Sequence, residues 1–124
     1  MGGSLYKSME EVTGIYELLS LAEEKKLYRD LIRQLNKDFK FANLEADYEE
    51  DIHPVTLKQL LHETVFNLIN QRFADYLNLL YIIDVSEAKV KELDGSDILK
   101  LSEAVVLLIL KREWQKVWFR YKYQ

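Results

Sequence analysis

The chain has no cysteine, which excludes disulfide bonds, thiolate catalysis and cysteine-based zinc or iron–sulfur sites. One proline and four glycines are too few for the many tight turns of a multistranded sheet. The longest apolar run, residues 104–110, is far shorter than the roughly 20 residues that a membrane-spanning helix needs. Residues 1–6 contain no basic segment followed by an apolar run, so no signal peptide is visible. We therefore expect an all-α, cytoplasmic protein that is not transmembrane.

Length and composition favour one domain. The chain has 124 residues, of which 48% are hydrophobic and 31% charged, as in globular proteins. We predict that residues 8–124 form a single helical bundle domain. Residues 1–7 are predicted to be a disordered leader, part of which can be left over from cloning.

Apolar residues recur at spacings of three and four along most of the first 40 residues, which indicates helix. Two serines stand three residues before a glutamate, the spacing of a capping box (Ser8–Glu11 and Ser20–Glu23). If the second pair caps a new helix, the chain breaks near Ser20 and a helix runs from about 22 to about 39. Otherwise residues 8–40 form one bent helix.

The clearest helical pattern runs from Thr56 to Ile83, and it predicts a single helix of 28 residues, roughly 42 Å long. Either Pro54 or Thr56 can start it. A short helix capped by Ser86 and a long one from about Asp97 to about 122 follow. We therefore predict a bundle of four main helices plus one short connecting helix.

Two segments are apolar on nearly every side, residues 77–83 and 104–110. A helix of this kind is normally surrounded, which a three-helix arrangement of one short chain does not achieve. Either the first helix covers these segments as a fourth member or a second copy of the chain does, and both can hold. We expect a homo-oligomer, most simply a dimer.

The residues that could carry chemistry lack the required spacing. The acidic connection 45–53 holds a Glu50-x-x-His53 pair, but no second such pair exists, so we interpret it as a solvated loop. His62 has no second histidine at zinc-helix spacing, and caps or exposed turns explain the serines (Ser86, Ser96 and Ser102). No catalytic, cofactor-binding or metal-binding residue is predicted, and we expect no enzyme.

Arg72 lies at the edge of the inner stripe of the predicted 56–83 helix, with Asp75 three residues later. In one interpretation its stem packs inward while its guanidinium stays in water. In the other, Arg72, Asp75 and Tyr76 form a buried polar cluster with a carboxylate of another helix.

The C-terminal helix is basic and aromatic. Residues 111–124 carry five cations and one carboxylate, a net charge of +4, so the rest of this −4 chain carries −8. A surface for single-stranded nucleic acid, an anionic membrane or a partner protein is one interpretation (Arg112, Lys116, Phe119, Arg120 and Tyr123). In the other, Trp114 and Trp118 belong to the core and the cationic ridge faces the acidic remainder of the chain.

Two segments, LNLLYIIDVSE at 77–87 and LILKREWQKVWFR at 108–120, resemble parts of small uncharacterised helical proteins of Bacteroidetes-type bacteria. The resemblance implies a bacterial cytosolic protein and brings no activity, cofactor or site with it. The leading hypothesis is a non-catalytic protein-interaction or scaffold module that self-associates. A nucleic-acid-binding accessory protein is the alternative, and an enzyme or metal protein comes third.

Overall fold

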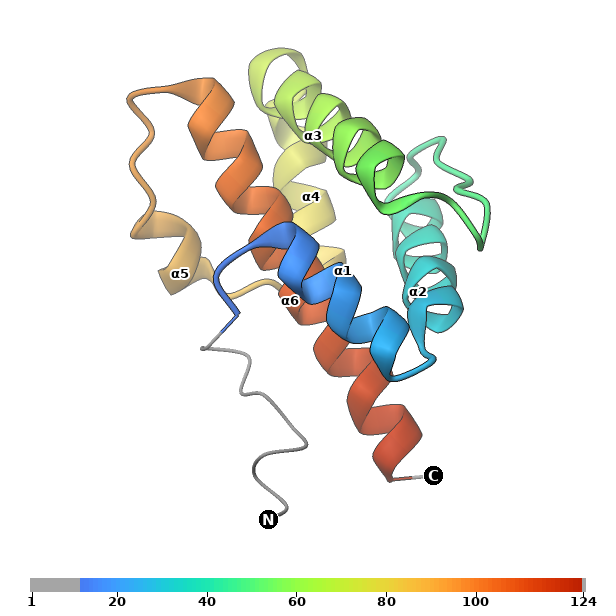
Figure 1. Ribbon diagram of the computed structural model, residues 1–124. Helices are drawn as coiled ribbons and strands as arrows, with labels where there is room; N and C mark the ends of the chain where they lie inside the picture. The colour runs from blue at the N-terminus through green and yellow to red at the C-terminus, as the bar shows by residue number, and fades with distance from the viewer. Residues whose placement is uncertain (1–11, 124) are drawn as a thin grey trace.

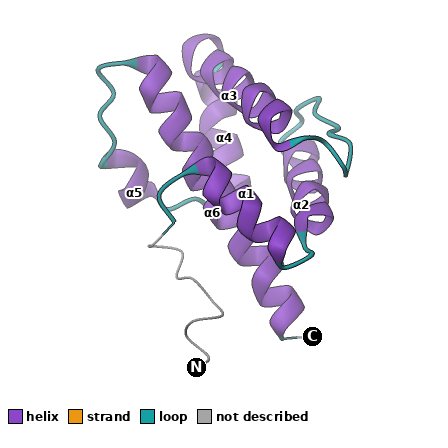
Figure 2. Ribbon diagram, in the orientation of Figure 1, coloured by secondary structure: helices purple, strands orange, loops and turns teal. Residues whose placement is uncertain are grey.

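The computed structural model describes residues 12–123, and these residues form helices and loops without any strand (Figure 2). There are six helices: α1 (Ile15–Glu24), α2 (Tyr28–Phe41), α3 (Pro54–Gln71), α4 (Phe73–Ile83), α5 (Glu87–Lys91) and α6 (Ile98–Lys122). The all-α prediction is confirmed. The predicted leader, residues 1–7, and the Ser8–Glu11 capping box lie outside the described residues.

The long helix α6 is the centre of the fold, because α1, α2, α3 and α4 all contact it (Figure 1). Its apolar segment 104–110 is covered by these helices, which bury Val105, Val106, Ile109 and Leu110. The chain itself therefore covers the segment 104–110, and no second copy is required to bury it. Among residues 12–123, no helix combines the length and the hydropathy required to cross a bilayer.

Of the two alternatives left open for residues 8–40, the structure has two helices. They separate at residues 25–27 and not near Ser20, so the second begins at Tyr28 where a start at about 22 was predicted. Ser20 lies inside α1, which begins after Gly14 and ends at Glu24. The chain turns at Lys26, whose φ of 61° is left-handed, and the next N–H, of Leu27, donates to the Ala22 carbonyl at 2.9 Å. Such a left-handed residue ends a helix by giving its last carbonyls a donor.

The predicted 28-residue helix was also wrong, since it is divided at Arg72 into α3 and α4. Arg72 has φ −139° and ψ 60°, outside the helical region, so α4 departs in a new direction behind α3 (Figure 1). The break lets α4 pack against α2 and α6, with Tyr76, Leu79, Leu80 and Ile83 buried. A straight rod would carry those side chains past the end of the core. The described chain thus has six helices where five were predicted.

The predicted starts of α3, α5 and α6 agree with the structure. Pro54, rather than Thr56, begins α3, and His53 Nδ1 accepts the Val55 N–H at 3.2 Å. Ser86 caps α5, and the Asp97 carboxylate accepts N–H groups at the start of α6. These starts depend on local side-chain hydrogen bonds from capping residues, and such residue types can be recognised in the sequence.

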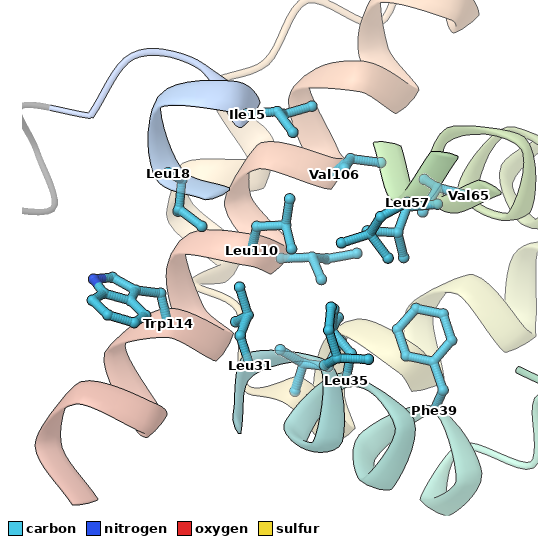
Figure 3. Close-up of a cluster of buried hydrophobic side chains, with 14 of the residues drawn as sticks. Ile15, Leu18, Leu31, Leu35, Phe39, Leu57, Val65, Val106, Leu110 and Trp114 are labelled. Carbon is cyan, nitrogen blue, oxygen red and sulfur yellow. The ribbon is translucent and has the colours of Figure 1, made fainter. Parts of the chain in front are cut away.

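The core lies between α6 and the helices around it, and Figure 3 shows part of it. Trp114 from α6 is 1% exposed and lies beside Leu18 of α1 and Leu31 of α2. Trp118 is only partly buried and packs at the edge of the core. The prediction that both tryptophans continue the inner face of the last helix is confirmed for Trp114 and in part for Trp118.

Candidate functional site

The cationic ridge of α6 faces other parts of the chain. The Arg112 guanidinium donates to the Asp84 carbonyl and carboxylate at 3.1 Å each. Lys116 Nζ donates to Asp38 Oδ2 at 2.7 Å, and Arg120 Nη1 donates to Gln34 Oε1 at 3.0 Å. This geometry agrees with the interpretation in which the ridge faces the acidic remainder.

The two aromatic residues of the predicted C-terminal surface do not join these cations. Phe119 and Tyr123 are both exposed, and their ring centroids lie 6.0 Å apart at an interplanar angle of 44°. The five residues predicted as one surface are therefore divided between three cations that bind acceptors of the chain itself and an exposed aromatic pair.

A buried polar network joins α2 to α6. Gln34 Nε2 donates to Asp38 Oδ2 at 3.1 Å, so the Gln34 amide connects Arg120 to the Asp38 carboxylate. Lys116 Nζ lies 3.4 Å from Glu113 Oε1 as well as contacting Asp38. Glu113 has no exposed surface at all, and Asp38 is only 5% exposed. Two carboxyl groups thus share one ammonium group inside the protein.

Burial decides the charge state of this pair. Removal from water, followed by the interaction with Asp38, raises the pKa of Glu113 to about 9. Burial alone would also raise the pKa of Asp38, but hydrogen bonds from Glu113, Lys116 and Gln34 lower it overall. Neither Glu113 oxygen accepts a hydrogen bond of good geometry, and a proton on Glu113 turns its contact with Asp38 into one. At neutral pH the network holds a neutral Glu113 beside an ionised Asp38.

Glu113 was not among the predicted site residues, because in the sequence it stands out only as the single acid among the five cations of residues 111–124. A signal was present, because Glu113 stands four residues from Ile109 and four from Val117, both of which are buried. A carboxyl group at such an inner position is rare and needs partners.

Of the two interpretations of Arg72, the structure agrees with the one in which the guanidinium stays in water, and the buried cluster of Arg72, Asp75 and Tyr76 does not form. Arg72 Nε does pair with Asp75 Oδ2 at 2.7 Å, but the two side chains are 57% and 44% exposed. Only Tyr76 is buried, and burial raises the pKa of its hydroxyl. Because Arg72 lies at the break between α3 and α4, its side chain leaves the inner stripe on which the cluster depended.

The outer face of α4 is apolar. Phe73, Leu77 and Tyr81 follow one another at every fourth position, and they are 55%, 51% and 75% exposed. The Phe73 ring is held against the buried Tyr76 ring, with 5.3 Å between centroids. We call these three residues the α4 stripe. The apolar segment 77–83 is therefore covered by the chain on its inner side and open on its outer side.

His62 and Ser102 form a histidine–serine pair that the sequence analysis did not expect. His62 Nε2 lies 2.7 Å from Ser102 Oγ, and the same hydroxyl lies 2.9 Å from the Leu99 carbonyl. Ser102 was expected at a cap or an exposed turn, but it is completely buried within α6. A hydroxyl without access to solvent has no room for a substrate, so the pair links α3 to α6.

The acidic connection 45–53 is held by cations from α2. Glu50 accepts from Arg33 at 2.8 Å and 3.0 Å, and Arg29 approaches it to 3.9 Å. The Tyr28 hydroxyl donates to the Ile52 carbonyl. Within residues 12–123, no three histidine, aspartate or glutamate side chains converge as metal ligands.

Comparisons with known proteins add no assignment to this geometry. No protein-family model, no curated protein and no solved structure matches the chain.

Proposed function

We propose that the chain is a non-catalytic protein-interaction module of the bacterial cytoplasm that self-associates as a homodimer through the α4 stripe. The observation that carries the proposal is the line of three large exposed side chains, Phe73, Leu77 and Tyr81. They lie on a helix whose opposite face is already buried in the core.

The composition of the stripe supports this proposal. An outer helix of a small domain normally carries polar side chains on its solvent face, whereas the solvent side of α4 carries three large apolar side chains beside the polar Asp75 and Asn78. Typical surface areas of large side chains, multiplied by the exposed fractions of these three residues, give roughly 300 Å² of exposed apolar surface for the stripe. A contiguous patch of this size is at the level that often marks an interaction site.

The size of the stripe sets the expected affinity. Two stripes in contact remove roughly 600 Å² from water, which is less than the roughly 1,000 Å² of a stable specific interface, so flanking side chains must add to the contact. We therefore expect a weak dimer whose population rises with concentration, rather than an obligate one. A closed core beneath the stripe fits this expectation, because the chain does not need its partner to fold.

The nucleic-acid alternative has less support. The three cations that suggested it, Arg112, Lys116 and Arg120, each donate to acceptors of the chain itself. Breaking these contacts for a phosphate would uncover Asp38 and Gln34 inside the protein.

The test is sedimentation velocity from about 1 µM to about 1 mM, the range over which small interfaces dissociate. We expect the weight-average mass to rise toward the dimer, and Leu77→Ser to shift the midpoint upward at least tenfold (~1.4 kcal/mol). Leu99→Ser is the matched control, because Leu99 is a leucine of similar exposure, 58%, on α6. A chain that stays monomeric throughout contradicts the proposed function.

A further inference from the structure

We propose that a cavity between the α4–α5 turn and α6 binds a phosphorylated small molecule. The turn, residues 84–86, runs beside the middle of α6 (Figure 1), and Arg112 joins the two through its hydrogen bonds to Asp84. The cavity has a volume of about 440 Å³ and is open to solvent, and its size is typical of small-molecule sites. It includes no residue of the α4 stripe, so the inference goes beyond the proposed function.

The cavity contains two cations that no carboxylate of the chain neutralises. Lys89 of α5 and Lys111 of α6 both line it, and within residues 12–123 neither ammonium group forms an ion pair. The third cation, Arg112, is paired with Asp84, which is the only acidic residue of the lining. Three cations and one carboxylate give the cavity a net charge of +2, although the whole chain carries −4. An anion can therefore bind the two lysines and leave the Arg112–Asp84 pair intact.

The hydrogen-bonding capacity left in the lining is mostly that of donors. Gln115 Oε1 accepts from Arg112 Nη1 at 2.7 Å, which leaves the amide N–H groups of Gln115 to donate. Ser86 Oγ accepts the backbone N–H of Lys89 at 3.3 Å, which leaves the hydroxyl proton of Ser86 to donate. Lysine side chains only donate. A ligand that suits these groups carries several acceptor oxygens and about two negative charges, as a phosphate monoester does.

The apolar part of the lining favours an ester over the free phosphate ion. Val85 of the turn and Leu108 of α6 are partly buried and face the same cavity as the two lysines. An inorganic phosphate ion leaves these two side chains in contact with water. The carbon atoms of an organic phosphate cover them, and removing apolar surface from water adds to the binding free energy.

The test is a titration followed by heteronuclear NMR with three probes, phenyl phosphate, inorganic phosphate and phenol. We expect phenyl phosphate to saturate with a Kd on the order of 1 mM and to shift the amide signals of residues 84–89 and 108–115. Inorganic phosphate should bind about fivefold more weakly, because it lacks the apolar ring. Phenol should give no saturable shift, because it lacks the charge.

Three variants locate the site. Lys89→Gln and Lys111→Gln should each weaken the binding of phenyl phosphate about fivefold, because each removes one unpaired charge from the cavity. Lys91→Gln is the matched control, since Lys91 is an exposed lysine of the same short helix as Lys89 and lies outside the lining. Because Lys89 is exposed, Lys89→Gln should keep the fold, and the same spectra report it.

Each of four results would overturn the inference. Without a saturable shift up to about 10 mM phenyl phosphate, the cavity is not a phosphate site. If Lys91→Gln weakens binding as much as Lys89→Gln, the attraction belongs to the general charge of the surface. If inorganic phosphate binds as tightly as phenyl phosphate, the occupant is the free ion and not an ester. If phenol binds as tightly as phenyl phosphate, the cavity recognises the ring and not the phosphate. None of these results depends on whether the chain dimerises.

Discussion

Replacing Glu113 by glutamine should stabilise the protein at neutral pH. Glu113 is completely buried, and its pKa in the folded state is raised to about 9, first by burial and then by the neighbouring Asp38 carboxylate. In the unfolded chain its pKa returns to about 4.5. Folding at neutral pH therefore requires Glu113 to take up a proton, whereas glutamine has the same shape, is always neutral and offers an N–H to Asp38.

The size of the effect follows from proton linkage. Between about pH 4.5 and pH 9 the folded state holds one more proton than the unfolded state, so stability falls by up to about 1.4 kcal/mol for each pH unit. At pH 7 this amounts to about 3 kcal/mol relative to pH 4.5. The lowered pKa of Asp38 has the opposite sign, since its contribution is lost as pH falls through values below about 4, outside this window. Glu113→Gln should thus be more stable than wild type by about 3 kcal/mol at pH 7 and about equal near pH 4.5.

The measurement is urea unfolding followed by tryptophan fluorescence and circular dichroism at about pH 5, 7 and 8.5. The Glu113→Gln curve should be nearly flat where the wild-type stability falls. Glu63→Gln is the control, because Glu63 is exposed on α3 and its substitution should leave the pH dependence unchanged. If Glu113→Gln runs parallel to wild type across this range, Glu113 is not a neutral group in the folded protein and the reasoning is refuted.

Three further substitutions test other parts of the fold. Lys116→Met should destabilise the protein by about 3–5 kcal/mol in urea unfolding, because it leaves the buried Asp38 carboxylate without its cation. Adding Asp38→Asn to this variant should recover part of the lost stability. An unchanged unfolding midpoint in Lys116→Met would contradict the proposed network. Lys26→Gly should stabilise the protein by up to about 1 kcal/mol in thermal unfolding, since a left-handed φ of 61° strains a residue with a side chain. A Tm below that of wild type would contradict this explanation. Asp97→Ala should lower stability by about 1 kcal/mol through loss of the cap on α6, whereas Asp97→Ser should stay close to wild type if the cap is the cause.

The starts of α3, α5 and α6 were predicted, whereas the start of α2 and the break before α4 were not. Starts are capped by side chains such as Ser86 and Asp97, whose chemistry is visible in the sequence. The ends of α1, α2 and α4 are made by left-handed residues, none of them glycine: Lys26, Asn43 and Asp84. Each is followed by a residue whose N–H reaches back to a carbonyl five residues earlier. Asn and Asp adopt this conformation more readily than other residues with a side chain, but lysine does not, so nothing local marked the turn at Lys26.

The division at Arg72 has a similar origin. The apolar pattern is continuous from Thr56 to Ile83, and no proline or glycine interrupts it. The break exists because α4 must turn to bury its inner face against α2 and α6, which is a demand of the whole core rather than of the residues at the break. The predicted cluster of Arg72, Asp75 and Tyr76 failed with the straight helix on which it depended.

The sequence by itself determined that residues 12–123 are all-α and where α3, α5 and α6 begin, because these features depend on composition, periodicity and local hydrogen bonds. Only the tertiary structure decided how charges and apolar surfaces are used. It brings α2 against α6, which pairs Lys116 with Asp38 and encloses Glu113, and it covers one side of the 77–83 segment while leaving the other open. The enclosed Glu113 and the half-covered 77–83 segment both arise from contacts between residues far apart in the chain, so no local sequence pattern could predict them.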